Sequence, residues 1–243
     1  MRKILTLLTI AILSQFSGCR KLADHFFHVD TSVIKSCRIV KIYHGDRTGI
    51  VYYNDHNDPD SVIFDVPYGS SGASYFYFIY NDHHQLIEYR EDYHREPPGN
   101  YYYKHTYVYN NGIIQTDTTR VRQSGAWTEL RTLHYDLNRR IIKEDRRIIE
   151  MEGQIVDDEV EPFKYTYDIA GNLEGQPNTY DDKINFLRTN KIWMFTQRNY
   201  SMNNPVGATA YNDQGLPLGF QPGSEPQFLF GTLVGIDYEC EGK

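Results

Sequence analysis

The stretch KYTYDIAGNLEG, residues 164–175, carries the features of a β-hairpin. Tyrosine alternates with other residues at its start, and one of these is β-branched, which is typical of a pleated strand. The aspartate and the Ala170-Gly171-Asn172 segment then suit a tight turn, because Asp, Asn and Gly accept the backbone conformations that turns require. Leu173 begins the returning strand. The stretch therefore predicts two antiparallel strands joined by a short turn.

The same pattern recurs along the chain, which indicates a repeat. A tyrosine followed by Asn or Asp occurs at Tyr53, Tyr80, Tyr109, Tyr135, Tyr167 and Tyr211. The aliphatic residue that opens each return is Val62 (after an insertion), Leu86, Ile113, Ile141, Leu173 or Leu216. The fold class is therefore predicted to be all-β: an antiparallel meander of about six β-hairpin repeats in an open, strip-like or partly curled sheet.

The first residues have the layout of a secretory signal. Arg2 and Lys3 precede an apolar run from Ile4 to Leu13 that is too short for a stable membrane span. Ser17-Gly18 directly before Cys19 resembles the lipobox of bacterial lipoproteins, which implies cleavage ahead of Cys19 and acylation of its thiol. The alternative is an ordinary cleaved signal. We expect a lipoprotein signal peptide at 1–18, an N-terminal tether at 19–36 and a single β domain at 37–243.

The repeat copies resemble the tyrosine–aspartate repeats of bacterial wall-associated and Rhs-type proteins, whose family fold is a strip of β-hairpins. The whole layout, a lipobox followed by degenerate copies, is similar to uncharacterised lipoproteins common in Bacteroidota over most of residues 45–220. This resemblance implies the architecture and a lipid anchor in the outer membrane, on the periplasmic face or the cell surface. It says little about activity, because one fold hosts many functions.

Residues 177–206 break the repeat pattern. The polar run from Asp181 to Lys183, followed by apolar residues at 186–187 and 192–195, predicts a short irregular or helical cap around 181–200. Such a cap would pack on one face of the sheet, since an unsealed sheet needs a cover. We interpret Trp193 as part of this cap, and the alternative is a ligand-stacking platform.

Charge and cysteine usage limit the partners and the compartment. The formal net charge is −7, and loss of the signal peptide makes it more negative, so no nucleic-acid partner is expected. The basic cluster from Arg139 to Arg147 is interleaved with acids and is interpreted as a solvated strand face. Cys37 and Cys240 lie near the two ends of the mature chain. They could form a disulfide, or they could remain two buried thiols.

No motif specifies a metal, a cofactor or a catalytic reaction. The 9 histidines lack zinc-ligand spacing, and His83 with His84 is expected at a hairpin tip. Asp55 to Ser61 is rich in oxygen ligands but departs from a calcium loop, so we interpret it as an enlarged turn. The acids from Asp157 to Glu161 are interpreted as a solvated loop. We expect no metal, no cofactor and no enzymatic activity.

Aromatic residues make up 14% of the chain, including 21 tyrosines. Most are expected to stabilise the sheet through cross-strand pairs. The runs at 75–80 and 101–103 carry aromatics on both faces of a strand, and the second face needs a partner. The candidate ligand-stacking residues are Tyr75, Tyr77, Tyr101, Tyr103 and Trp193.

These features together predict a lipid-anchored protein of the cell envelope that acts as a structural or binding module. Its expected partners are the membrane, through the lipid, and a glycan or another envelope protein. The alternative function is an envelope hydrolase that acts on glycans, which would need two inward carboxylates in a cleft.

Overall fold

The computed structural model describes residues 37–65, 74–92, 101–122, 125–175, 179–205 and 207–241. The predicted signal peptide, Cys19 and the tether at 19–36 lie outside the described residues. The described chain is all-β, and its main feature is one 13-stranded antiparallel sheet with the order β10-β9-β8-β7-β6-β5-β4-β3-β2-β1-β17-β14-β13. From β1 to β10, each strand pairs with the next one in sequence, so the predicted meander is confirmed.

The bounds of the elements follow the hairpin pattern. The sheet consists of β1 (Cys37–His44), β2 (Arg47–Tyr53), β3 (Pro59–Phe64), β4 (Tyr75–Tyr80), β5 (Leu86–Asp92), β6 (Tyr101–Asn110), β7 (Ile113–Val121), β8 (Trp127–Tyr135), β9 (Ile141–Met151), β10 (Gln154–Lys164), β13 (Ala208–Tyr211), β14 (Pro217–Phe220) and β17 (Gly235–Cys240). The remaining elements are β11 (Tyr180–Ile184), the short 3-10 helix η1 (Phe186–Thr189), α2 (Lys191–Thr196), β12 (Asn203–Pro205), β15 (Gln227–Phe228) and β16 (Gly231–Thr232).

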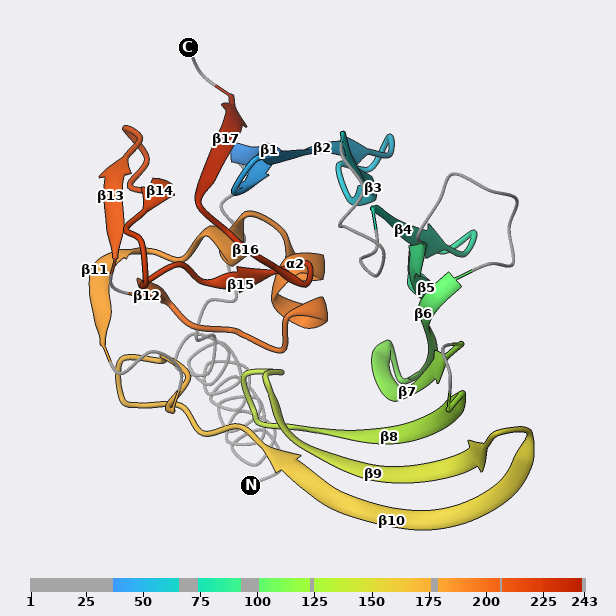
Figure 1. Ribbon diagram of the computed structural model, residues 1–243. Coiled ribbons are helices and arrows are strands. Elements are labelled where there is room, and N and C mark those ends of the chain that lie inside the picture. The colour runs from blue at the N-terminus through green and yellow to red at the C-terminus, as the bar shows by residue number, and fades with distance from the viewer. Residues whose placement is uncertain are drawn as a thin grey trace, which may run out of the picture.

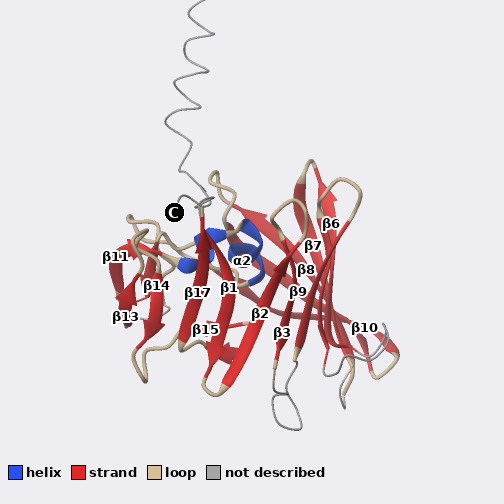
Figure 2. Ribbon diagram, turned by 90° about the horizontal axis from the view of Figure 1, so that it is seen from above, coloured by secondary structure: helices blue, strands red, loops and turns tan. Residues whose placement is uncertain are grey.

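The sheet curls around α2, β15 and β16, which lie inside the curl (Figure 1). Seen from above, α2 lies behind β17 and β1, on the inner side of the sheet (Figure 2). Among the described residues the sheet ends at β10 and β13, so its curl is not closed and these two strands form its edges. The cap predicted around 181–200 is confirmed, because η1 and α2 occupy that segment. No helix in the described ranges is long and apolar enough to cross a bilayer.

Five of the six repeat tyrosines lead into the same turn. In the second copy, Asn81 donates its backbone N–H to the carbonyl of Gln85 and accepts from the amide of His84. Its side-chain oxygen accepts from the amides of His83 and Gln85, which closes the turn from within. The third residue after the Asn or Asp has a positive φ in all five turns: Asn57, His84, Arg139, Gly171 and Gly215.

Two details of the turns differ from the sequence interpretation. The turn of the first copy is not enlarged. As in the second copy, the backbone N–H of Asn54 donates to the carbonyl of Asp58 and the amide of Asn57 donates to the carbonyl of Asn54, and β3 begins directly afterwards. The third copy turns through Asn111 and Gly112, which both have positive φ, so it is a two-residue hairpin of the type that Asn-Gly favours. The expected placement of His83 and His84 at a hairpin tip is confirmed.

The repeat tyrosines tie consecutive hairpins together. The hydroxyl of Tyr80 donates to the carbonyl of Pro59 at 2.7 Å, and Tyr109 donates in the same way to Leu86 at 3.1 Å. In both pairs the acceptor belongs to the return strand of the previous hairpin. Tyr135 follows the same rule with Ile114 at 2.6 Å. Tyr238 of β17, which is not a repeat tyrosine, donates in a similar way to Pro217 at 2.9 Å.

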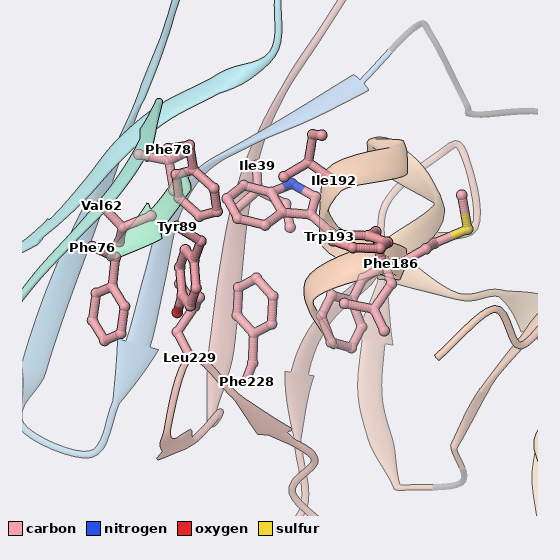
Figure 3. Packing of buried hydrophobic residues seen from close by; sticks show 14 of the residues in the cluster. Ile39, Val62, Phe76, Phe78, Tyr89, Phe186, Ile192, Trp193, Phe228 and Leu229 are labelled. Carbon is pink, nitrogen blue, oxygen red and sulfur yellow. The ribbon is translucent and has the colours of Figure 1, made fainter. Parts of the chain in front are cut away.

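The core fills the space between the curled sheet and the inner elements (Figure 3). Trp193 of α2 is 0% exposed and makes edge-to-face contacts with Phe78 of β4 and Phe228 of β15, both at 5.4 Å between ring centroids. Phe186 packs on Phe228 in the same geometry. Trp193 has no surface left to offer a ligand, so its assignment as a stacking residue was wrong and its interpretation as part of the cap holds.

A disulfide joins the first and last described strands. Cys37 and Cys240 lie opposite each other in the β1–β17 ladder, and their sulfur atoms are bonded at 2.04 Å. This decides between the two alternatives that the sequence left open. A cross-link over 203 residues of sequence removes much of the conformational freedom of the unfolded chain, which in the entropy model is worth up to about 5 kcal/mol.

The free edge at β10 is protected against pairing with another chain. Its ladder with β9 is interrupted by two register shifts, and its sequence contains Pro162 and several acids, all of which discourage edge-to-edge association. The acids from Asp157 to Glu161 therefore lie in a strand, and their interpretation as a loop was wrong. The hairpin turns at Glu152 and Gly153, both with positive φ.

Candidate binding face and buried charge network

The structure separates the predicted stacking tyrosines. Phe76 and Phe78 point into the core, so Tyr75 and Tyr77, which alternate with them, lie half-buried on the outer, convex face of β4. Tyr103 lies opposite the buried Glu91 and Val121, on the inner face, where its ring stacks on Phe230 at 5.7 Å. The five candidates therefore do not form one platform.

Tyr101 supports other side chains. Tyr101 is only 8% exposed. The ammonium of Lys104 lies 5.1 Å and the guanidinium of Arg122 lies 4.4 Å from the centroid of its ring. Cations over a ring face are attracted by its quadrupole, so the tyrosine holds them in place. Its proposed role in stacking on a ligand was wrong, because the cations occupy the surface above the ring.

A row of side chains crosses the convex face of β2 to β7. The pairing register places Tyr52 opposite Ser61, Ser61 opposite Tyr77 and Tyr77 opposite Arg90. The register continues from Arg90 to Lys104 and from Lys104 to Arg120. We call these six residues, Tyr52, Ser61, Tyr77, Arg90, Lys104 and Arg120, the convex row. Five strand spacings of about 4.8 Å give it a length of about 24 Å.

Three cations in the convex row lie directly opposite one another on neighbouring strands. Like charges in this position destabilise a sheet, and neighbouring carboxylates neutralise the three cations only in part. Glu88 lies 3.6 Å from both Arg90 and Lys104, and Asp92 lies 3.2 Å from Arg90. Arg120 is exposed and has no carboxylate partner within the described ranges. The row therefore carries surplus positive charge on a chain whose net charge is −7.

Sequence reasoning found Tyr77 but missed the other members of the convex row. Arg90 and Arg120 alternate with buried residues in their own strands, as Arg120 does between Thr119 and Val121, whereas the neighbours of Lys104 are half-buried. That alternation was the available signal for an outward direction. The alignment of the three cations depends on the register of four separate strands, which the sequence pattern does not specify.

The inner face carries a buried charge network that sequence reasoning also missed. Arg198, two residues beyond α2, donates from Nε to Glu144 at 2.6 Å and from Nη2 to Asp117 at 2.5 Å. Both carboxylates are 0% exposed, and they come from β9 and β7. One guanidinium thus ties the segment after α2 to two strands of the sheet.

The network extends across β6 to β9. Arg131 lies 2.7 Å from Glu129 and 3.6 Å from Glu144, Arg146 lies 2.5 Å from Glu129, and His105 lies 3.0 Å from Asp117. The basic cluster at 139–147 is therefore not a uniformly solvated face: Glu144 and Arg146 point inward, whereas Lys143 and Arg147 alternate with them and point outward.

The network holds its charges despite burial. Burial alone would raise the pKa of Asp117, but His105, Arg198 and Arg131 lower it to about 2. Burial opposes the charge of Arg198, yet Glu144 and Asp117 raise its pKa above the usual value. The ion pairs therefore persist at neutral pH and fix the segment after α2 against the sheet.

Glu91 differs from the other inner acids. Burial raises its pKa well above the usual range, with hydrogen bonding to Tyr89 opposing the shift and Asp92 adding to it. A carboxyl group that stays protonated is what a general acid requires. Glu91 is only 1% exposed, however, so a substrate does not reach it in this conformation.

The comparisons with known proteins give no family for this chain. No protein-family model matches its sequence, and no curated protein matches it either. Within the part of the chain that the structure describes, no cluster of three or more His, Cys, Asp or Glu side chains could hold a metal ion.

Proposed function

We propose that the chain is a lipid-anchored protein of the cell envelope whose curled sheet is a binding module, and that the convex row binds an acidic glycan. The observation that carries this proposal is the alignment of Arg90, Lys104 and Arg120 on neighbouring strands, next to Tyr77. A sheet that keeps like charges opposite one another loses stability, and a negatively charged ligand recovers it.

The chemistry of the row fits a sugar polymer with carboxylate, sulfate or phosphate groups. Guanidinium groups form paired hydrogen bonds with such anions, and tyrosine rings pack against the apolar face of a sugar. Tyr52 is 47% exposed and lies at one end of the row, with the cations at the other. A length of about 24 Å, from the strand spacing, suits several linked sugar units better than a single one.

The location in the envelope is supported by two features of the chain. Ser17-Gly18-Cys19 has the pattern of a lipidation site, and we propose that the outer membrane holds the lipid. The Cys37–Cys240 disulfide fits an oxidising compartment outside the cytoplasm, where such bonds persist. The alternative of a glycan hydrolase has no comparable support, because Glu91, Asp117, Glu129 and Glu144 are all buried.

A glycan array tests this function with the chain from Arg20 to Lys243, which keeps every described residue. We expect binding to acidic glycans and weak or no binding to their neutral counterparts. Arg120→Glu should remove the signal, because it reverses the charge of an exposed member of the row. Arg147→Glu makes the same charge change on β9, away from the row, and should retain the signal.

Three array results would contradict the proposal. They are equal binding to neutral and acidic glycans, equal loss in the two variants, and no binding by folded protein. In the last case a protein partner would become the better hypothesis for the convex face.

A further inference from the structure

A cavity of about 480 Å³ lies between α2 and the turns of the second, third and fourth repeat copies. Its volume is within the range of about 300 to 1,000 Å³ that is usual for small-molecule sites. It lies at the turn edge of the sheet, and no residue of the convex row lines it. It is therefore a separate feature from the proposed glycan surface.

The interior of the cavity is apolar and aromatic. Ile192 and Phe195 of α2 form one wall, and Ile114, Tyr109 and Tyr135 from the sheet form another. The hydroxyls of the two tyrosines already donate to backbone carbonyls, so these residues present mainly ring surface. A ligand body that fits here is apolar or aromatic.

The charged side chains at the cavity are basic. Arg139, Lys191, His83 and His84 line it, and no Asp or Glu does, although acids outnumber bases in the chain by 32 to 25. Arg139 is exposed and has no carboxylate partner within the described ranges. The nearest carboxylate oxygen recorded for Lys191 belongs to Asp58, at 3.9 Å, which is close to the limit for an ion pair.

We propose that this cavity binds a small amphiphilic carboxylate, with one apolar body between α2 and the repeat tyrosines and its anionic group at Arg139 and Lys191. The basic side chains of the lining favour an anionic ligand, and the apolar walls favour a ligand with an apolar body. The volume of about 480 Å³ suits a free molecule with a single chain or ring.

The test is an NMR titration of the ¹⁵N-labelled chain from Arg20 with 4-phenylbutyrate. The matched control ligand is 4-phenylbutanamide, which has the same shape and no charge. We expect saturable shifts of the amides of Gly112, Ile113 and Ile192, and at least fivefold weaker binding of the amide compound. Equal affinity for the two compounds, or shifts that avoid these residues, would overturn the proposal.

Variants separate the two features of the site. The double variant Arg139→Asn/Lys191→Gln removes the charges, and Asn tolerates the positive φ of 59° at position 139. It should bind 4-phenylbutyrate at least tenfold more weakly. Ile113→Trp keeps the charges and fills the cavity mouth, so it should abolish saturable binding. Arg120→Glu on the convex face should change the affinity by less than twofold.

The thermal midpoint of each variant establishes that it is folded. Unchanged binding in both cavity variants would overturn the proposal, and so would an equal loss in Arg120→Glu, which would indicate a general effect of charge. Failure of the glycan array leaves this result unaffected, because the two experiments use different ligands and different residues.

Discussion

The hydroxyl of Tyr109 donates a hydrogen bond to the carbonyl oxygen of Leu86 at 3.1 Å, across the boundary between two hairpin repeats. Tyr80, Tyr135 and Tyr238 make the corresponding bond elsewhere in the sheet. For Tyr80, Tyr109 and Tyr135, this explains why the repeat uses tyrosine where phenylalanine would supply the same apolar surface. The ring packs in the core and the hydroxyl fixes the position of the preceding hairpin.

Tyr109→Phe should therefore destabilise the protein while leaving its core packed. The variant loses one hydrogen bond and leaves a carbonyl without its partner, so we expect the free energy of unfolding to fall by about 1 kcal/mol. Urea denaturation measures this. Tyr52→Phe removes a hydroxyl from an exposed ring and should have almost no effect. Equal changes in both variants would show that the inter-repeat bond contributes nothing.

The buried charge network should depend strongly on Arg198. Arg198→Met removes the guanidinium and leaves Asp117 and Glu144 buried with less compensation, which is expected to cost about 3 to 5 kcal/mol. The matched control is Arg147→Met, whose partner Asp157 is exposed, and an exposed pair contributes at most about 1 kcal/mol. Denaturant unfolding compares them, and similar losses in the two variants would contradict the assignment.

His44 should make the protein less stable in acid. Burial, reinforced by Arg47, lowers the pKa of His44 from 6.5 to about 4. As the pH falls below 6.5, the unfolded chain takes up this proton before the folded chain does. Stability that is fully present above pH 6.5 is then lost progressively down to pH 4, by up to about 3 kcal/mol.

The variant His44→Phe isolates this contribution. It keeps an aromatic ring next to Phe64, which lies 4.9 Å from the His44 ring, and it cannot titrate. Unfolding measured at pH 7, 5.5 and 4 should show a smaller loss than in the wild type. Parallel pH profiles for the two proteins would mean that His44 does not titrate in this range.

Reduction of the Cys37–Cys240 disulfide should lower the unfolding free energy by several kcal/mol, up to about 5 in the chain-entropy model. The double variant Cys37→Ser/Cys240→Ser should show the same loss without reductant, and adding reductant to it should change nothing. Thermal unfolding with and without dithiothreitol is the measurement. A wild-type midpoint that is insensitive to reductant would contradict a structural role for the bond.

Much of the fold could be predicted because its determinants are local. The Tyr–Asx pattern and the left-handed turn residues, such as Gly215, specify tight turns from neighbouring residues alone. At 164–175 the turn forms, but its flanks pair only through one bridge between Tyr167 and Leu173, so the two strands predicted there were wrong. The interruption of the repeat pattern around Trp193 predicted the cap, because that signal also lies in one local stretch of sequence. The strand at 154–164 was missed because its acids oppose strand formation, although Glu152-Gly153 offered a turn signal.

The candidate surfaces could be predicted only in part, because they depend on register. Tyr77 was identified from an aromatic run, but its neighbours in the convex row come from other strands. Glu144 and Arg198 meet through the curl of the sheet and the path of the segment after α2. Neither feature leaves a pattern within one stretch of sequence.

The central claim is that the convex row binds an acidic glycan, and calorimetric titration with tetragalacturonate tests it most directly. The account predicts saturable binding that weakens with added salt and is absent for the neutral methyl ester. It predicts an affinity about tenfold lower in Arg120→Glu, equivalent to about 1.4 kcal/mol, and unchanged in Arg147→Glu. No heat of binding in the wild type, or an equal loss in both variants, would contradict it.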